Sequence, residues 1–187
     1  MQEDDIHLDH QLMQRISASD NLAYDMLFRK YYVYLCGVVF RMIQDKQQSE
    51  DVVQEVFLEI WRKRETIEVK NAVKSYLHRA SINRTLNQLK AKKVNFAEEE
   101  SLKTVVSSNS TPLQKMQGEE LESVINKAYL TLPDRCRIVF TMVKHEGLSY
   151  KLTAEKLEIS IKTVENQVSK ALKIMRAAIN KYKSESE

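Results

Sequence analysis

Apolar residues recur at intervals of three and four along most of this chain, the spacing of helices that pack one face on a core. In the first half this pattern predicts a short helix over 8–16 and longer helices over 21–43, 49–64 and 71–90. The predicted buried stripe of the 21–43 helix consists of Leu22, Met26, Leu27, Tyr31, Tyr34, Leu35, Val38, Val39 and Met42. Ser49 is the predicted N-cap of the third helix, because its hydroxyl can accept a hydrogen bond from a free backbone N–H.

The periodic pattern stops in the middle of the chain and then resumes. Residues 94–117 contain an EEE run, an SSNST run and a proline, which predicts a flexible linker. Beyond the linker we expect helices over 118–132, 134–147, 149–157 and 161–183, with a tight turn at 158–160. Pro133 ends the first of these helices, Asp134 is the predicted cap of the second, and Ser149 is the predicted cap of the third.

The composition favours an all-α protein. Three glycines and two prolines among 187 residues are too few for an architecture of strands and tight turns. A hydrophobic content of 43% is enough for real cores. We therefore expect an N-terminal extension (1–20) and two small helical domains (21–93 and 118–187), joined by the flexible linker.

The distribution of charge is more informative than the mild net charge of +3. The 49–64 helix carries Glu50, Asp51, Gln54, Glu55 and Glu59 beside its apolar stripe. From Arg62 to Lys93, ten Lys or Arg residues stand against two acidic ones. An acidic helix beside a strongly basic segment indicates two different partners, a protein with a basic surface and a nucleic acid.

Two helices have polar faces suited to nucleic acid. The 71–93 segment places basic and amide side chains beside an aromatic ring, the combination that binds single-stranded DNA: Lys74, Tyr76, His78, Arg79, Asn83, Arg84, Asn87 and Lys90. The last two helices have the spacing of a helix-turn-helix, with Val164, Val168, Ala171 and Leu172 inward. Its outward side offers Lys162, Thr163, Glu165, Asn166, Ser169, Lys170 and Lys173 to base edges and phosphates. The alternative for each helix is an ordinary solvated charged face.

No arrangement of residues predicts an enzyme, a cofactor site or a metal site. The chain lacks a glycine-rich phosphate loop and a nucleophile paired with a base. His7 and His10 lie beside acidic residues, but we interpret the N-terminus as solvated rather than as a metal site. Cys36 and Cys136 fall within apolar patterns and are expected to be buried thiols of a cytoplasmic protein. We expect neither a secretory signal nor a membrane span.

Five segments together resemble the sigma-70 family of transcription initiation factors, of the extracytoplasmic-function (group IV) type. They are YDMLFRKYYVYL, SEDVVQEVFLEIW, SYLHRASINRTLNQLK, LTLPDRCRIVFTMVKHEGLSY and EISIKTVENQVSKALKIMR. They occur in the family's order and spacing and, with the chain between them, span about four fifths of the sequence. The TVENQVSKAL wording is most similar to the Bacteroidetes branch.

The resemblance implies a role for each segment. The residues at the positions that contact the clamp helices of the polymerase β′ subunit are Asp51, Gln54, Glu55, Phe57 and Trp61; for Phe57 and Trp61, a place in the core is the alternative. The −10 promoter element would be melted and bound by Lys74, Tyr76, Arg79, Asn83, Arg84 and Asn87, with a flipped base captured by the 65–70 loop. The −35 element would be read by the seven outward residues of the last helix, named above.

The chain departs from the family's pattern at four places. Tyr76 stands near a usual tryptophan, and Glu165 stands where relatives often carry a basic residue. A carboxylate at position 165 can accept a hydrogen bond from the amine of cytosine, so we expect a different −35 preference. Glu158 replaces a common glycine in the turn, so the turn either takes a left-handed residue at some cost or differs in shape. Leu152 and Thr153 replace an acidic residue and an isoleucine, which changes the side chains available to pack that short helix.

The partners that the resemblance implies are core RNA polymerase (the β′ clamp helices and the β flap), promoter DNA and a membrane-anchored anti-sigma factor. Two alternatives are a stand-alone helix-turn-helix transcriptional regulator and a helical module that sequesters a protein. The acidic 49–64 helix argues against the first, since such a regulator needs no polymerase surface. The clustered basic faces argue against the second.

Overall fold

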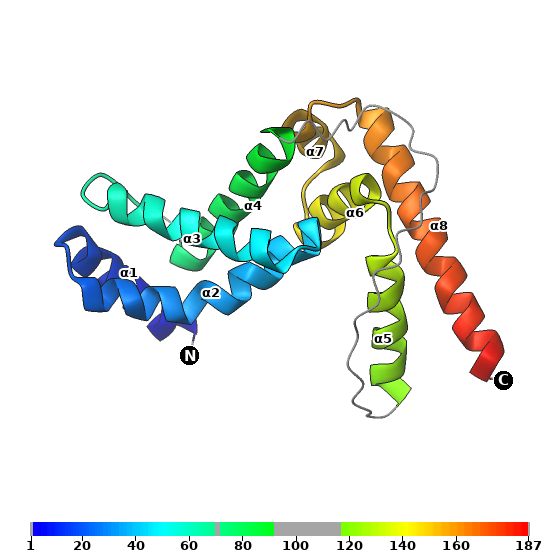
Figure 1. The fold of residues 1–187 in the computed structure, drawn as a ribbon, viewed down its shortest axis with the longest axis horizontal. Coiled ribbons are helices and arrows are strands. Elements are labelled where there is room, and N and C mark those ends of the chain that lie inside the picture. Colours follow the sequence, from blue (N-terminus) through cyan, green and yellow to red (C-terminus); the bar gives the residue numbers. More distant parts are fainter. Residues whose placement is uncertain (1, 70–71, 92–116, 187) are drawn as a thin grey trace. The chain divides into compact units, whose positions relative to one another are not determined.

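The structure is a computed structural model that describes residues 2–69, 72–91 and 117–186 (Figure 1). Helices are the regular elements throughout these ranges. No strand occurs in these ranges, which confirms the all-α prediction. None of their helices is both long and apolar enough to cross a bilayer. The chain divides into two compact units, Met1–Val94 and Asn95–Glu187. The predicted linker, apart from Gln117, lies outside the described residues.

The first unit consists of α1 (Gln2–Ser17), α2 (Asn21–Ile43), α3 (Lys46–Arg62) and α4 (Val73–Ala91). Helix α2 packs against the other three. Their shared core is made by fully or almost fully buried side chains, among them Ile16, Leu27, Leu35, Val39, Val53, Phe57, Ile60 and Leu77. The predicted stripe of α2 is too wide, however, because Leu22, Met26 and Tyr34 are exposed.

Aspartates cap α2 and α3, and in α3 the aspartate takes the place of the predicted serine. The Asp20 carboxylate accepts from the backbone N–H groups of Leu22 and Ala23 and caps α2. Asp45 caps α3 by accepting from the N–H of Gln48 at 2.9 Å. Ser49 is therefore not the N-cap; it is buried one turn inside α3, where its hydroxyl donates to the Asp45 carbonyl at 2.6 Å.

Helix α1 is an integral part of the first unit, not a solvated extension. Leu12, Met13 and Ile16 lie in the core, and Asp9 is only 3% exposed. The Tyr31 hydroxyl and the Lys30 ammonium both donate to the Asp9 carboxylate, the latter at 2.7 Å. Burial opposes the charge of Lys30, but the bonds to Asp9 and Asp5 outweigh it and raise the pKa of Lys30. This network fastens α1 to α2, and the described residues contain no metal-binding cluster.

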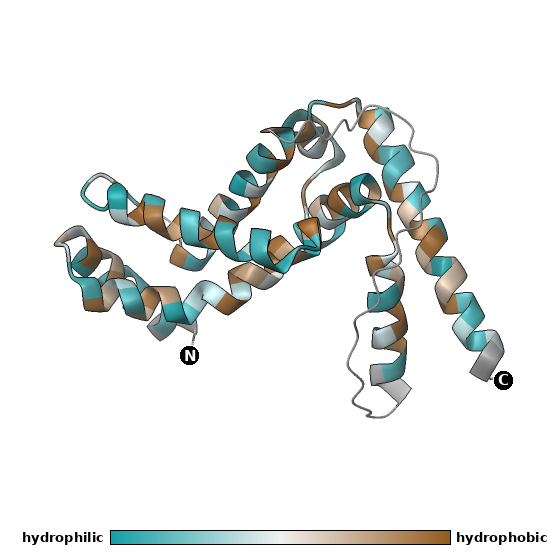
Figure 2. Ribbon diagram, viewed as in Figure 1, coloured by the Kyte–Doolittle hydropathy of each residue, from teal (hydrophilic) through white to brown (hydrophobic). Residues whose placement is uncertain are grey.

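The second unit consists of α5 (Gln117–Leu130), α6 (Asp134–Phe140), the π-helical turn η1 (Thr141–His145), α7 (Tyr150–Leu157) and α8 (Ile161–Ser186). Apolar residues line one side of α5 (Figure 2). The core of this second unit includes Tyr129, Leu132, Cys136, Phe140 and Ala171. Asp134 does not cap α6: Pro133 occupies that position, and Asp134 instead pairs with Arg137 at 2.5 Å.

The helix-turn-helix forms as predicted from the sequence. The Ser149 hydroxyl caps α7 by accepting from the N–H of Leu152 at 3.2 Å. Glu158 ends α7 in the left-handed region, with φ 58°, so the turn keeps its shape and takes a non-glycine residue at some cost. Ser160 then accepts from the N–H of Thr163 at 2.9 Å at the start of α8. Val164, Val168 and Ala171 face the core.

The departure at Thr153 leaves a polar group buried. Thr153 is fully buried, and its hydroxyl has no hydrogen-bond partner in the part of the chain that is described. We expect Thr153→Val to stabilise the second unit by about 1 kcal/mol, because valine removes an uncompensated polar group. Slower hydrogen exchange of the α7 and α8 amides would report this gain.

The matched control is Thr141→Val. Thr141 is equally buried, but its hydroxyl bonds to the Tyr129 hydroxyl and donates to the Arg137 carbonyl at 2.8 Å. This change should accelerate exchange, because it breaks satisfied bonds. Faster exchange in both variants would contradict the interpretation of Thr153.

Candidate functional site

The outward face of α3 is acidic and open to solvent. Asp51, Gln54 and Glu55 are exposed, whereas Val52, Val53, Val56 and Ile60 fill the core side of the same helix. Leu58 adds an apolar side chain that is 46% exposed. The three predicted polar residues therefore share one accessible face, with a composition suited to a basic protein surface.

The two predicted aromatic contacts have different surroundings. Phe57 is fully buried and packs edge-on against Phe28, with ring centroids 4.9 Å apart, and against Tyr24. It is a core residue, and the predicted polymerase contact through its ring is not available in this structure. Trp61 is half-buried, between Tyr24 at 5.2 Å and the Arg64 guanidinium at 4.8 Å from its ring centre. It remains accessible in part.

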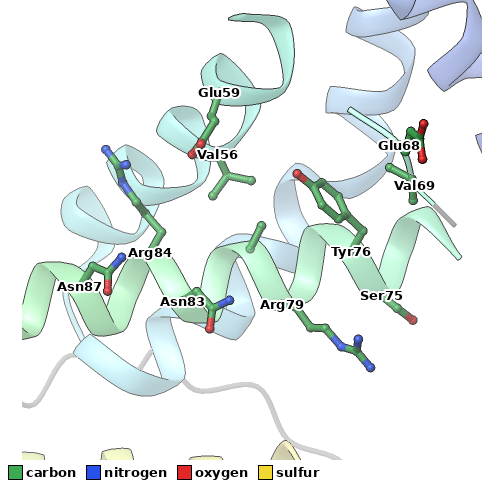
Figure 3. Close-up of a pocket in the computed structure, with 11 residues that line it drawn as sticks. Val56, Glu59, Glu68, Val69, Ser75, Tyr76, Arg79, Asn83, Arg84 and Asn87 are labelled. Carbon is green, nitrogen blue, oxygen red and sulfur yellow. The ribbon is translucent and has the colours of Figure 1, made fainter. Parts of the chain in front are cut away.

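A pocket of about 660 Å³ lies between α3, the loop after it and α4 (Figure 3). Its lining residues are Val56, Glu59, Glu68, Val69, Ser75, Tyr76, Arg79, Ala80, Asn83, Arg84 and Asn87. Five of the six residues predicted to bind the −10 element are among them. Arg84 reaches from α4 toward α3, whereas Arg79 extends from α4 on the side away from α3 (Figure 3).

Lys74 is the exception. Its ammonium lies 4.9 Å from the ring centre of Tyr34, on the flank of α4 that faces α2, and it does not line the pocket. The Tyr34 hydroxyl is hydrogen-bonded to Nδ1 of His78 at 2.8 Å on the same flank. The basic residues of α4 therefore belong to two surfaces. The sequence prediction grouped them as one surface, because all of them lie on the same helix.

Two carboxylates also line the pocket: Glu59, which sequence reasoning placed only on the acidic side of α3, and Glu68, from the loop predicted to capture a flipped base. The Lys63 ammonium donates to Glu59 at 2.6 Å, and this hydrogen bond, with the charges of Lys63 and Arg84, lowers the pKa of Glu59. Glu59 is therefore ionised at neutral pH. Glu68 comes from the loop after α3. Tyr76 lines the pocket from α4, and burial raises the pKa of its hydroxyl. The pocket thus presents a ring, two amides, cations and acceptors together, which suits a base edge better than a phosphate alone.

An ion pair joins the acidic face of α3 to the pocket. Nε of Arg84 donates to Oε2 of Glu55 at 2.6 Å, and a terminal nitrogen of the same guanidinium lies 2.5 Å from that oxygen. Sequence reasoning placed these residues on separate surfaces for separate partners. Their separation of 29 positions in the chain gives no signal of the contact.

All seven residues predicted to read the −35 element lie on the polar side of α8, outside its buried stripe. Lys162, Asn166, Ser169 and Lys173 are exposed, and Thr163, Glu165 and Lys170 are half-buried. The Lys162 ammonium lies 3.1 Å from the Glu165 carboxylate. One face of α8 therefore offers amide, hydroxyl, cationic and carboxylate groups, as base readout in a major groove needs.

Comparison with known proteins identifies similar sequences over both units. The family model described as Sigma-70 region 2 matches residues 27–94, and that described as Sigma-70, region 4 matches residues 124–175. The RNA polymerase sigma-H factor of Pseudomonas aeruginosa is 28% identical over 186 residues, covering 92% of each chain. The ECF RNA polymerase sigma-E factor of Haemophilus influenzae is 26% identical, covering 91% of this chain and 95% of its own. A solved structure of the sigma factor RpoE in complex with the anti-sigma factor NepR from Bartonella quintana is 17% identical, with a TM-score of 0.47, covering 84% of this chain and 96% of that one.

Proposed function

This chain belongs to the sigma-70 family, as a factor of the extracytoplasmic-function type, and we propose a division of labour between its surfaces. It is a transcription initiation factor that binds core RNA polymerase and directs it to promoters through the −10 and −35 elements. The matches to region 2 and region 4 fall on the first and second units, respectively. We assign polymerase binding and the −10 element to 21–93, and the −35 element to 118–187.

The exposed acidic face of α3 binds the clamp helices of the β′ subunit. Asp51, Gln54 and Glu55 supply the charge and hydrogen bonds, and Trp61 supplies an aromatic edge beside them. Phe57 acts indirectly by holding α3 on the core. A basic partner gains most from this face, because opposite charges across an interface speed association and exclude wrong partners.

The pocket beside α4 is the observation that carries the proposed function, and we assign the melted −10 strand to it. Its ring and amides can stack on and hydrogen-bond an unstacked base, and Arg79 offers a cation for the backbone. Extruding a base costs a few kcal/mol, which these contacts must offset. Because they are made only with the open strand, binding shifts the promoter toward the melted state.

The polar face of α8 reads the −35 duplex, and the second unit also contacts the β flap. Glu165, positioned by Lys162, accepts from the amine of a cytosine, so the preferred −35 element contains cytosine at the position it reaches. In this proposal the linker (94–117) connects the two units and lies in the RNA exit path of the polymerase. The factor performs no covalent chemistry, needs no cofactor and acts in the cytoplasm. A membrane-anchored anti-sigma factor is its expected regulator.

We expect Asn83→Ala to reduce promoter opening about tenfold while leaving the affinity for core polymerase unchanged. Asn83 lines the pocket and is exposed, so its loss removes base contacts made only in the open complex. Permanganate reactivity of −10 thymines, on a promoter selected from genomic fragments by the holoenzyme, would measure opening. Competition for core polymerase would measure binding.

Asn126→Ala, which truncates an exposed asparagine on α5, serves as the control and should alter neither readout. Equal loss of opening and of core affinity in Asn83→Ala would contradict the role assigned to the pocket. A stand-alone helix-turn-helix regulator would instead bind duplex DNA equally well with and without polymerase.

A further inference from the structure

The ion pair between Glu55 and Arg84 connects two surfaces that the proposed function gives to different partners. Glu55 belongs to the face of α3 assigned to polymerase, and Arg84 lines the pocket assigned to DNA. Two nitrogens of the guanidinium lie 2.5 Å and 2.6 Å from one carboxylate oxygen. In the free chain, each residue is therefore the other's partner.

The pair is accessible and easily exchanged. The side chains are 51% and 44% exposed for Glu55 and Arg84, respectively, so water and salt screen their attraction. A partner that offers Glu55 several cations in a drier interface competes effectively with a single exposed arginine. The partner can bind the Glu55 carboxylate only if Arg84 releases it.

Released Arg84 stays beside the pocket. The hydrogen bond from Lys63 is the main cause of the lowered pKa of Glu59, but the charge of Arg84 adds to it, which places the guanidinium within the field of a second carboxylate on the pocket wall. Arg84 reaches across the space between α4 and α3, where Glu59 and Val56 face it (Figure 3). A guanidinium freed from Glu55 regains donors and charge for a phosphate or a base edge.

We propose that Glu55 holds Arg84 back from single-stranded DNA in the free chain, and that core polymerase releases Arg84 by taking over Glu55. This inference rests on the proposed function and adds a regulatory link to it. Because such links are reciprocal, DNA bound at Arg84 also favours polymerase at Glu55. The strength of an exposed ion pair limits the effect to about two- to fivefold in affinity.

The test measures binding of the full-length free chain to a short, fluorescently labelled single-stranded DNA of random sequence by anisotropy at low salt. Glu55→Gln should tighten binding about two- to fivefold, and Arg84→Gln should weaken it. In the Arg84→Gln background, Glu55→Gln should have no further effect. Both side chains are exposed, so neither change threatens the core.

Glu50→Gln is the matched control, because it makes the same charge change on α3 at a carboxylate that pairs with Lys46, at 3.9 Å, and not with Arg84. It should tighten binding less than Glu55→Gln does. Equal tightening in both variants would reduce the effect to net charge and overturn the proposal. Weaker binding or no change in Glu55→Gln, or the same tightening without Arg84, would also overturn it.

A separate readout distinguishes this inference from the proposed function. Holoenzyme carrying Arg84→Gln, assembled at saturating core polymerase, should make fewer transcripts than wild type. If it does so while Glu55→Gln leaves DNA binding of the free chain unchanged, only the link between the two residues falls. If Arg84→Gln holoenzyme is as active as wild type, the assignment of Arg84 to DNA is wrong, and the link falls with it.

Discussion

Replacing Asp51 and Glu55 together with arginine is expected to weaken binding of this sigma factor to core RNA polymerase by about a hundredfold or more. The change converts two exposed anions on α3 into cations that face a basic surface. Like charges across an interface cost several kcal/mol, and each 1.4 kcal/mol is about a factor of ten in affinity. Competition against a labelled second sigma factor for a fixed amount of core polymerase would measure the loss.

Two controls separate this effect from others. Asp51 accepts a hydrogen bond from Gln47 at 3.2 Å and takes no part in the Glu55–Arg84 pair, so Asp51→Arg alone leaves that pair in place. This single variant should still lose a large part of the affinity for core polymerase. Arginine at Glu120 and Glu122 of α5 makes the same total charge change in the second unit and should change affinity by less than about threefold. Unchanged competition by the α3 double variant would show that polymerase binds elsewhere.

Phe57→Ala should destabilise the first unit by about 3–5 kcal/mol, the usual cost of removing a buried phenylalanine. The ring is fully buried and contacts the rings of Tyr24 and Phe28, so truncation leaves a cavity in the middle of the unit. A domain of this size is stable by only about 5–15 kcal/mol, so the loss is a large share of its stability. Loss of polymerase binding would then follow from unfolding and not from a missing contact.

The chain's single tryptophan, Trp61, offers a reporter confined to the first unit, so a urea titration followed by its fluorescence measures this loss directly. Leu58→Ala is the matched control on the same helix. Leu58 is 46% exposed, and its truncation should change the free energy of unfolding by less than about 0.5 kcal/mol. If Phe57→Ala left stability intact but weakened polymerase binding, the ring would have the interface role that its burial argues against.

Helical periodicity predicted most of the fold and much of the pocket. Most of the described helices lie close to the predicted ranges, because apolar spacing and turn residues are local signals. The exceptions are α1, which begins at Gln2 rather than at residue 8, and the 134–147 helix, which is α6 followed by the π-helical turn η1. The pocket residues of α4 lie at 75, 76, 79, 80, 83, 84 and 87, so one helical face carries them whatever surrounds it. The helix-turn-helix could be identified for the same reason.

What sequence reasoning missed depends on contacts between distant positions. The burial of Asp9 requires Lys30 and Tyr31 on another helix, and nothing near Asp9 in the chain signals those partners. Lys74 and Arg84 share a helix but face different neighbours, Tyr34 and Glu55, respectively. Asp45 replaced Ser49 as the N-cap because α3 starts one turn earlier than its apolar stripe indicates.

Whether this chain starts transcription is tested most directly with core polymerase on host genomic DNA, with and without the purified chain, by mapping start sites genome-wide. We expect new transcripts that begin only when the chain is present, downstream of shared −10 and −35 elements, and that disappear when Asp51 and Glu55 are replaced with arginine. Transcripts that are the same in number and position with and without the chain would contradict this expectation.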